Sequence, residues 1–362
     1  MNIVHIGVIG TGVMGERHCR VCANLPHVEL VGVADLNEER GRQVAERHET
    51  TYFSDYKALL SQLDAVIIAA STPAHHALAT ECLERGLHTL VEKPIAETAY
   101  QAQQLVQIAG QRGLVLQVGH IERFNPAFIE LKHVTEGMRL IGINVRRLSP
   151  FDTSNTDVDV IRDLMIHDLD LVVDAVGLDI ERLSASGRPI NTHAVDYATA
   201  TLSFRNGPTA SLTASRVTEQ KVRAIEVTAE GAYIEADLLN KSVQIHRRMF
   251  PQYLDNHSTT KYRQESLIER IYVPMSEPLM LELRHFVDCV RMNCRTQVPG
   301  TDGLRALRLA EAVACEVLGE VKPEAAGRSG DQYSHWSSEA KVHERETESM
   351  PRKIETAVAQ SA

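Results

Sequence analysis

Two short stretches of the sequence carry residue types that could do chemistry together. Lys93 lies in a Glu-Lys-Pro tripeptide directly after the apolar run 87–91. If that run is a strand of an α/β sheet, the ammonium lies at the strand's carboxyl end, where such sheets bind ligands. Asp163 and His167 lie four residues apart on one face of a predicted helix, and a histidine can carry a proton near neutral pH. The alternatives are a solvated lysine at an ordinary turn and the exposed face of an amphipathic helix.

A glycine-rich turn near the start of the sequence predicts a dinucleotide site. A predicted strand, 3–9, leads into it, and the turn consists of Gly10, Thr11, Gly12, Val13, Met14 and Gly15. In such a turn the glycines allow a tight bend, close approach of the backbone to a pyrophosphate, and packing of the following helix on its strand. A second predicted strand, 28–34, ends in Asp35, whose carboxylate can bind the adenosine ribose and repels a 2′-phosphate. We therefore predict NAD rather than NADP, with a helix cap as the alternative role of Asp35.

The elements that would position these residues alternate between strands and helices. Further strands are predicted over 65–70, 87–91 and 114–118, with helices between them. Over residues 1–121 this alternation predicts a doubly wound parallel sheet. The carboxyl ends of its strands meet at one edge, beside the nicotinamide end of a bound cofactor. The candidate cofactor contacts at that edge are Ser71, Thr72, Pro73, His75, Glu92 and Lys93.

The pattern changes in the second half of the chain. A long apolar helix is predicted over 158–176, and strands that alternate apolar and polar residues between 182 and 273 predict a mainly antiparallel sheet. One polar stripe runs along the helix, formed by Asp163, His167, Asp170 and Asp174. We expect a loop over the polar stretch 247–269 and a polar tail, disordered or loosely docked, over 322–362. Shorter helices are expected over 127–135, 278–292 and 301–318.

Composition excludes several classes of function. The 362 residues carry a formal charge of −10, which argues against nucleic acid or an anionic membrane as the main partner. No apolar run is long enough to span a bilayer, and no signal-peptide pattern is present. The six cysteines are scattered, so we expect reduced thiols and a cytoplasmic protein. Cys19 and Cys22 lie inside a predicted helix without a second pair at zinc spacing, so no metal site is expected.

Taken in order, these motifs resemble the glucose–fructose oxidoreductase, inositol dehydrogenase and MocA-type sugar dehydrogenase (Gfo/Idh/MocA) family over residues 2–320. The marks are the glycine-rich turn, Thr72-Pro73 with a following histidine (His75 rather than His76), Glu92-Lys93-Pro94, and Asp163-x-x-x-His167-Asp168. The resemblance implies a Rossmann domain (1–121) and an α/β domain (122–320) with a large, mainly antiparallel open sheet. It also implies a homodimer or homotetramer formed through that sheet, and places residues 322–362 outside the family pattern.

The resemblance further implies that Lys93, Asp163 and His167 form a catalytic triad for oxidising a secondary alcohol, with the choice between Lys93 and His167 as proton acceptor left open. One branch of the family acts at C3 of UDP-N-acetylhexosamines, with UDP-N-acetylglucosamine the leading substrate. Arginines suit a diphosphate, and Arg123, Arg146, Arg147 and Arg162 lie near the expected cleft. The candidate substrate contacts are Lys93, Arg123, Asn125, Arg147, Arg162, Asp163 and His167. The alternatives are an inositol or simple-sugar dehydrogenase and a non-catalytic, dinucleotide-sensing regulator.

Overall fold

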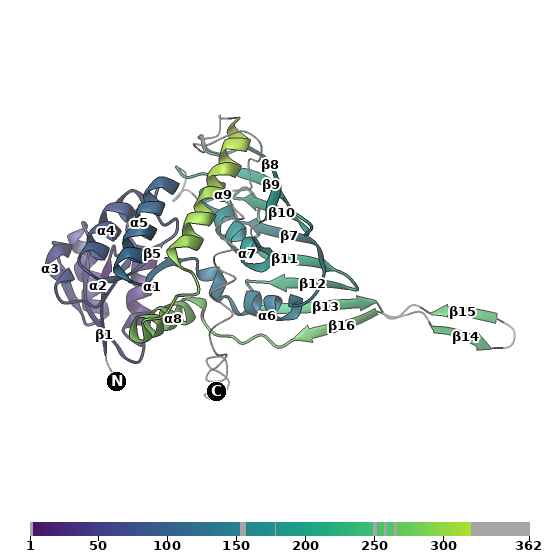
Figure 1. Cartoon of the computed structure of the whole chain (residues 1–362), viewed down its shortest axis with the longest axis horizontal. Coiled ribbons are helices and arrows are strands. Elements are labelled where there is room, and N and C mark those ends of the chain that lie inside the picture. Colours follow the sequence, from purple (N-terminus) through teal and green to yellow (C-terminus); the bar gives the residue numbers. More distant parts are fainter. Residues whose placement is uncertain are drawn as a thin grey trace.

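The computed structural model describes residues 3–152, 157–177, 179–248, 252–256, 259–263 and 266–319. Two large sheets dominate it, a parallel one built from the first part of the chain and a mixed, mainly antiparallel one from the second (Figure 1). This architecture confirms the predicted α/β fold class, including the doubly wound first sheet. The predicted tail, 322–362, lies outside the described residues.

The first sheet has six parallel strands in the order β3-β2-β1-β4-β5-β6. Its elements are β1 (Val4–Ile9), α1 (Val13–Cys22), β2 (Val28–Ala34), α2 (Glu38–Arg47), β3 (Thr51–Phe53), α3 (Tyr56–Leu60), β4 (Ala65–Ile68), α4 (Thr72–Glu84), β5 (His88–Glu92), α5 (Ala99–Arg112) and β6 (Leu116–Gly119). The central strands are almost wholly apolar because helices cover both faces of the sheet, and every residue of β4 is buried.

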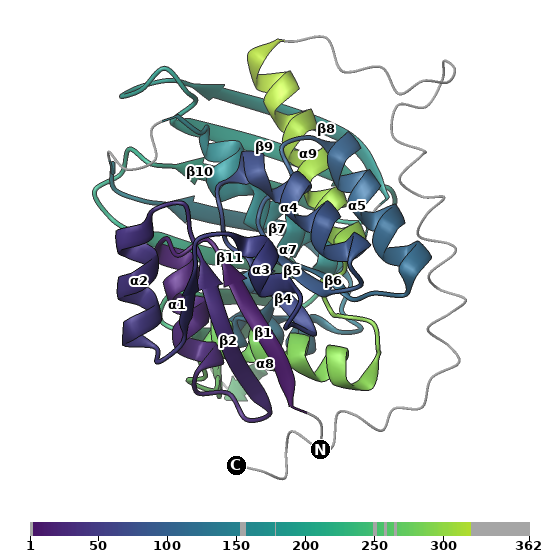
Figure 2. The same ribbon diagram turned by 90° about the vertical axis from the view of Figure 1, so that its left-hand side faces the viewer.

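Two helices from the end of the described chain return to this first sheet. Helices α1, α2 and α8 (Pro278–Met292) contribute to the core on one face, and α4, α5 and α9 (Gly300–Leu318) to the core on the other (Figure 2). Neighbouring residues of one strand point to different cores, as Ile67 and Ile68 do. None of the described helices combines the length and apolarity that crossing a bilayer requires.

The second sheet has eight strands in the order β16-β13-β12-β11-β7-β10-β9-β8, of which only the β7–β10 pair is parallel. Its strands are β7 (Leu140–Leu148), β8 (Ile180–Arg188), β9 (Tyr197–Phe204), β10 (Thr209–Ser215), β11 (Val222–Ala229), β12 (Ala232–Asp237), β13 (Ser242–Arg248) and β16 (Ser266–Ile271). Helices α6 (Pro126–Thr135), α7 (Ile166–Val176) and α9 share a core with one face of it (Figure 1). Strand residues alternate between buried and exposed because the helices cover that face.

Two predictions of local structure were wrong. The expected loop over 247–269 contains a separate two-stranded sheet, β14 (Gln252–Asn256) and β15 (Thr259–Arg263), which projects beyond the body of the protein (Figure 1). The stretch is mostly polar and lacks the sustained apolar alternation that identifies strands in sequence. The long helix expected over 158–176 is also divided, because a π-helical segment, Ile161–Met165, precedes α7.

Candidate active site

Lys93 and Asp163, 70 residues apart in sequence, lie in direct contact. Lys93 follows the last residue of β5, and its Nζ donates to the backbone oxygen of Asp163 at 2.8 Å and to Asp163 Oδ1 at 3.1 Å. Asp163 lies in the π-helical segment, a feature that often accompanies functional sites. Both side chains are about one-fifth exposed, so a ligand can still reach them. The end of β5 and the π-helical segment therefore meet at two of the residues that sequence analysis singled out.

His167 lies in the first turn of α7, one turn after Asp163. Its pKa is held well below 6.5, first by burial and then by the positive charges of Lys93 and Arg147, so the ring is neutral at pH 7. The ring of His120 meets it edge-on, with centroids 6.2 Å apart. Within the described chain, Nδ1 of His167 has no hydrogen-bond partner. A neutral imidazole with an unused nitrogen is able to accept a proton.

The glycine-rich turn has the shape that a dinucleotide needs. Gly10 has a φ of +91°, and a Cβ there would lie 2.6 Å from the backbone of Ala69; a Cβ on Gly15 would lie 1.8 Å from the oxygen of Gly10. A Cβ on Gly12 would meet nothing within 4 Å, so the outer side of the turn is open. Gly12 is also the N-cap of α1, and no side chain caps that helix end. Two glycines are thus required by the fold itself, and the third leaves the amides of α1 accessible to a pyrophosphate.

Asp35 lies beside this turn, and its carboxylate is already hydrogen-bonded. Thr11 donates to Asp35 Oδ2 from its backbone nitrogen at 2.6 Å and from Oγ1 at 2.8 Å, and Asn37 donates its backbone nitrogen to Oδ1 at 2.7 Å. Arg40 Nη2 lies 2.8 and 2.9 Å from the two oxygens. Burial raises the pKa of Asp35, but these donors outweigh it and hold the pKa below its usual range. Sequence analysis missed Arg40, whose position on α2 facing Asp35 becomes evident only in the fold.

The remaining predicted cofactor contacts lie at the ends of β4 and β5. Ser71 is the N-cap of α4 but makes no side-chain cap bond, and Thr72 and Pro73 form the first turn of that helix. His75 is buried, and its ring nitrogens lie 2.8 Å from the oxygen of Pro94 and 3.0 Å from that of Ala70. This geometry fits a residue that ties the two strand ends together rather than one that reaches a cofactor with its ring.

Glu92, also predicted at the cofactor, is buried within the fold. Its Oε1 lies 2.7 Å from His18 Nε2, and its Oε2 accepts a bond from the backbone nitrogen of Lys93 at 3.3 Å. Burial raises the pKa of Glu92, but His18 and Lys93 together bring it below the usual value. Its side chain packs against Gly119, where a Cβ would lie 2.9 Å from Oε2. Glu92 therefore positions the backbone before Lys93.

The predicted substrate-binding arginines are all engaged with carboxylates. Arg123 is 2% exposed and bonds Asp170, Asp174 and Asp302; Arg147 is 4% exposed and bonds Asp168 and Glu122. Arg162 bonds Asp159 at 2.5 Å, and Arg146 bonds Glu226 at 2.5 Å. Buried guanidiniums in these pairs stabilise the fold, so the geometry does not support the prediction that Arg123 and Arg147 bind substrate.

Asn125 likewise has a structural position. Its Oδ1 caps α6 by accepting a bond from Ala127 at 3.1 Å, and its Nδ2 donates to Glu122 and to the oxygen of Leu238, each at 3.0 Å. The side chain is 4% exposed. A helix cap with both polar atoms bonded has little capacity for a ligand, so the predicted substrate contact finds no support here.

Arg223 is a cationic residue of this region that sequence analysis missed. It lies on β11 opposite Arg147, and within the described chain it donates only to neutral oxygens: those of Leu148 at 2.7 Å, Val222 at 2.8 Å and the hydroxyl of Ser149 at 3.0 Å. Burial and the neighbouring Arg147 lower its pKa to about 10. The only signal in the sequence was an arginine just before a predicted strand, far along the chain from Lys93.

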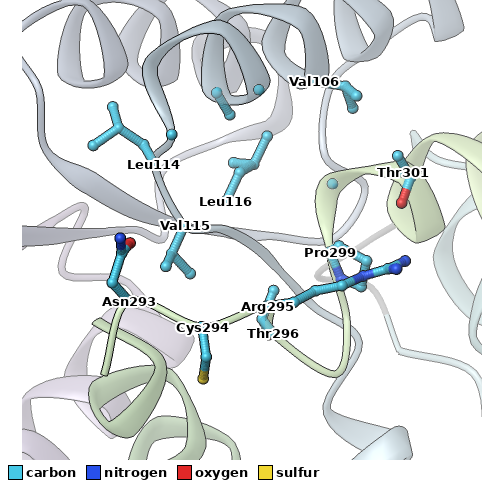
Figure 3. A pocket seen from close by; sticks show the side chains of 14 residues that line it. Val106, Leu114, Val115, Leu116, Asn293, Cys294, Arg295, Thr296, Pro299 and Thr301 are labelled. Carbon is cyan, nitrogen blue, oxygen red and sulfur yellow. The ribbon is translucent and has the colours of Figure 1, made fainter. Parts of the chain in front are cut away.

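A cavity of about 420 Å³ lies away from these residues. It opens between the end of α5, the segment leading into β6, and the α8–α9 connection, and Cys294, Arg295 and Thr301 are among the side chains around it (Figure 3). Because β5 and β6 are parallel, the start of β6 lies at the opposite edge of the sheet from Lys93. This cavity therefore is not the place where the predicted catalytic residues meet.

Comparison with known proteins agrees with this geometry. The model of the oxidoreductase family with an NAD-binding Rossmann fold matches residues 4–120, and that of the GFO/IDH/MocA C-terminal domain matches residues 146–235. The chain is 37% identical over 242 residues to a UDP-N-acetylglucosamine 3-dehydrogenase from Acidithiobacillus ferrooxidans. The aligned residues cover 67% of this chain and 76% of the relative. It is also 37% identical over 140 residues to inositol 2-dehydrogenase 1 of Saccharopolyspora erythraea. That alignment covers 37% of this chain and 41% of the relative.

Solved structures give the same result. The structure of the Acidithiobacillus ferrooxidans UDP-N-acetylglucosamine 3-dehydrogenase superimposes with a TM-score of 0.81 at 31% identity, covering 89% of this chain and all of the other. An oxidoreductase from Agrobacterium radiobacter in complex with NAD⁺, 18% identical with a TM-score of 0.74 over 91% of this chain and 98% of its own, shares the fold. The chain belongs to the Gfo/Idh/MocA family. It is an NAD-dependent oxidoreductase, which confirms the predicted family, class of enzyme and cofactor.

Proposed function

We propose that this enzyme oxidises the C3 hydroxyl of UDP-N-acetylglucosamine to a ketone. The observation that carries the catalytic part is the meeting of Lys93, Asp163 and the neutral His167 at the carboxyl edge of the dinucleotide-binding sheet. The substrate is supported by the similarity to the Acidithiobacillus ferrooxidans UDP-N-acetylglucosamine 3-dehydrogenase along most of both chains.

The cofactor would be held by the open turn at Gly12, by the amides at the start of α1 and by Asp35. Bound NAD supplies the acceptor for the hydride that leaves the sugar carbon. The ammonium of Lys93 can donate to the reacting oxygen and stabilise the negative charge that develops on it. The ring of His167, neutral and partly exposed, can accept the hydroxyl proton.

Asp163 would act on Lys93. Its carboxylate and its backbone oxygen both bind the Lys93 ammonium, which fixes the direction of that side chain. Placing Lys93 in this way also keeps a positive charge near His167, one of the causes of its lowered pKa. Asp163 is thus proposed as a positioning residue for the two groups that face the alcohol.

The division into domains at residues 1–121 and 122–320 and assembly through the second sheet remain proposals. The second sheet packs its helices on one face, and large apolar side chains such as Ile141 and Tyr233 are exposed on its strands at 57% and 36%. A sheet face of this kind can associate with a second copy of the chain. Light scattering after gel filtration, compared with the 40.2 kDa of one chain, would give the number of copies.

The function is tested by following NADH formation with four candidate substrates: UDP-N-acetylglucosamine, N-acetylglucosamine, glucose and myo-inositol. We expect efficient turnover of the UDP-sugar and little of the others. Turnover of myo-inositol or of a free sugar, with none of the UDP-sugar, overturns the proposed substrate and supports the inositol alternative that the Saccharopolyspora erythraea relative suggests. The product should be identified as the 3-keto sugar by mass spectrometry after reduction with borodeuteride.

A further inference from the structure

Positive charge near Lys93 and His167 is distributed unevenly. Arg123, Arg146, Arg147 and Arg162 each bind at least one carboxylate. Arg223 differs, because no carboxylate lies within ion-pair distance of it in the described part of the chain, and its bonds go to two backbone oxygens and one hydroxyl. Its charge nevertheless influences Asp163 and His167. Arg223 is therefore the one arginine of this group without a direct carboxylate partner in the described part of the chain, although Asp168, Glu122 and Asp163 act on it from beyond ion-pair distance.

The strand register fixes the direction of this side chain. Arg223 pairs with Arg147 across β11 and β7, and paired residues of adjacent strands project from the same face of a sheet. Arg147 is buried on the helix-covered face, where it bonds Asp168, the residue after His167. Arg146, one residue earlier, is exposed and projects from the opposite face. Arg223 thus lies on the side of the sheet that carries the catalytic residues.

The bonding pattern of Arg223 leaves donors for a ligand. A guanidinium has five N–H groups. Nη1 donates to Leu148 and Val222 and Nη2 donates to Ser149, which accounts for three of them. Nε and one N–H of Nη2 have no partner among the described residues. A guanidinium can present two such N–H groups to a pair of anionic oxygens in a fork.

The electrostatic state of Arg223 also favours an anion. Burial and the adjacent charge of Arg147 lower its pKa to about 10, so the folded protein holds this cation at a cost. A bound dianion would offset that cost, whereas a neutral sugar would not. Asp163, Asp168 and Glu122 offset part of that cost, but each is bonded directly to another cation, so an anionic ligand would be the first negative group in direct contact with Arg223.

We propose that Arg223 binds a phosphoryl group of the sugar nucleotide and thereby selects phosphorylated over free sugars. This inference rests on the proposed function, in that it names the part of the substrate that the site recognises. Ser149 and the backbone of Leu148 hold the guanidinium in place, and Nε with Nη2 faces the phosphoryl oxygens. Arg223 is a specificity-determining residue, since its role is to bind the part of the substrate that does not react.

The test measures binding of UDP to the NAD-loaded enzyme by isothermal titration calorimetry. We expect Arg223→Met to weaken UDP binding about 10- to 100-fold, because hydrogen bonds to a charged group are lost. Arg223→Lys should weaken it less, since it keeps the charge without the fork. Arg146→Met is the matched control: it removes an arginine from the neighbouring strand, on the other face of the sheet, and should change UDP binding less than two-fold. Unchanged UDP affinity in a folded Arg223→Met enzyme overturns the proposal.

Melting temperature and NAD affinity establish whether the variants are folded. Should Arg223→Met fail to fold, Arg223→Gln decides by the same criterion, because its amide can still donate to the oxygen of Leu148. Uridine and N-acetylglucosamine 1-phosphate serve as further ligands. A loss confined to the two phosphorylated ligands supports the assignment, and an equal loss for uridine overturns it.

The same experiment separates this inference from the proposed function. If wild type binds UDP through Arg223 but does not oxidise UDP-N-acetylglucosamine, the proposed substrate fails and the phosphoryl site stands. If the UDP-sugar is oxidised with the same KM by wild type and Arg223→Met, the phosphoryl site fails and the proposed function stands. Absence of UDP binding in the wild-type enzyme overturns the phosphoryl site.

Discussion

The two halves of the helical segment 161–176 carry similar residues in different surroundings. In the first half, Asp163 and His167 are partly exposed, and Nδ1 of His167 has no hydrogen-bond partner among the described residues. In the second half, Asp170 is 3% exposed and Asp174 is bound by both Arg123 and Lys132. Spacing alone placed all four on one polar stripe. The difference shows that the number of contacts already made by a polar side chain, more than its type, separates a stabilising residue from one available for chemistry.

The second half forms a closed ion cluster. Arg123 donates Nε to Asp170 at 2.6 Å and Nη2 to Asp302 at 3.3 Å, and it also binds Asp174. Arg305 joins the cluster at Asp302. These contacts connect the segment after β6 with α7 and α9, elements far apart in sequence. The cluster therefore helps to hold in place the half of the same helical segment that contains Asp163 and His167.

The largest effect is expected from breaking the closed cluster. Arg123→Met would leave buried carboxylates without a cation, so we expect a loss of about 3–5 kcal/mol in the free energy of unfolding. Urea titration followed by circular dichroism measures it. Arg139→Met is the control, because Arg139 is exposed and its 3.9 Å pair with Glu230 contributes at most about 1 kcal/mol. Equal stability of the two variants would show that the cluster is not structural.

Lys93, which binds Asp163 in the first half of the segment, should show the opposite balance: its replacement should affect turnover far more than stability. Lys93→Met removes the donor to the reacting oxygen, so we expect kcat to fall about 10²- to 10³-fold. Because Lys93 is partly exposed and its partner Asp163 can be solvated, the melting temperature should change by only a few degrees. NAD affinity should stay within a few-fold. Steady-state kinetics and thermal unfolding on one preparation give both values, and near-normal turnover would remove Lys93 from the mechanism.

The sequence predicted the residues that local patterns determine, but not the contacts between residues far apart in the chain. The glycine-rich turn, Asp35 and Lys93 are set by local patterns, since each lies at the end of a strand recognisable from its own residues. The contact of Lys93 with Asp163 followed only from a family resemblance. The pairing of Arg123 with Asp302, 179 residues away, had no signal, because which charges meet depends on how α9 returns to the body. For the same reason, arginines expected in the cleft are neutralised, and Arg223 was overlooked.

The contact between Asp35 and Arg40 provides a test of the preference for NAD over NADP. Asp35 is 5% exposed in its side chain, and its partner Arg40 is 49% exposed. Asp35→Ser should free Arg40 to meet a 2′-phosphate, so we expect the ratio of kcat/KM for NAD over NADP to fall about 10- to 100-fold. Arg42→Ser is the control, because Arg42 is paired with Glu38 along the same helix. An unchanged ratio would indicate that Asp35 serves only as a structural acceptor for Thr11.

The pH dependence of turnover tests the state of His167. Burial, Lys93 and Arg147 all lower the pKa of this group, so it stays neutral until the pH falls well below 6.5. We therefore expect kcat/KM to be constant from pH 8 down to 6.5 and to decline only at lower pH. The decline should approach tenfold per pH unit as the ring becomes protonated. An acid limb centred at or above pH 6.5 contradicts the proposed environment.

Glu282 differs from both halves of the helical segment. It is buried like the Arg123 cluster, but its carboxyl group has no cationic partner in the described part of the chain. It is fully buried on α8, and within the described chain neither carboxyl oxygen has a hydrogen-bond partner. Burial, with the negative charge of Glu92 added, raises its pKa well above 4.5, so the carboxyl group keeps its proton to a higher pH in the folded enzyme than in the unfolded chain. Glu92 is bound by His18 and remains the charged member of the pair.

The smallest effect should come from replacing this acid. Above pH 4.5 unfolding releases the proton of Glu282, so the folded state loses stability through this group as the pH rises toward its raised pKa. Gln keeps the shape but binds no proton. Glu282→Gln should therefore gain stability relative to wild type as the pH rises from 5 to 7. Glu316→Gln, on the exposed side of α9, is the control and should follow wild type throughout. Urea midpoints at the two pH values give the comparison, and a gap between Glu282→Gln and wild type that does not widen with pH would mean that the carboxyl group is not held protonated.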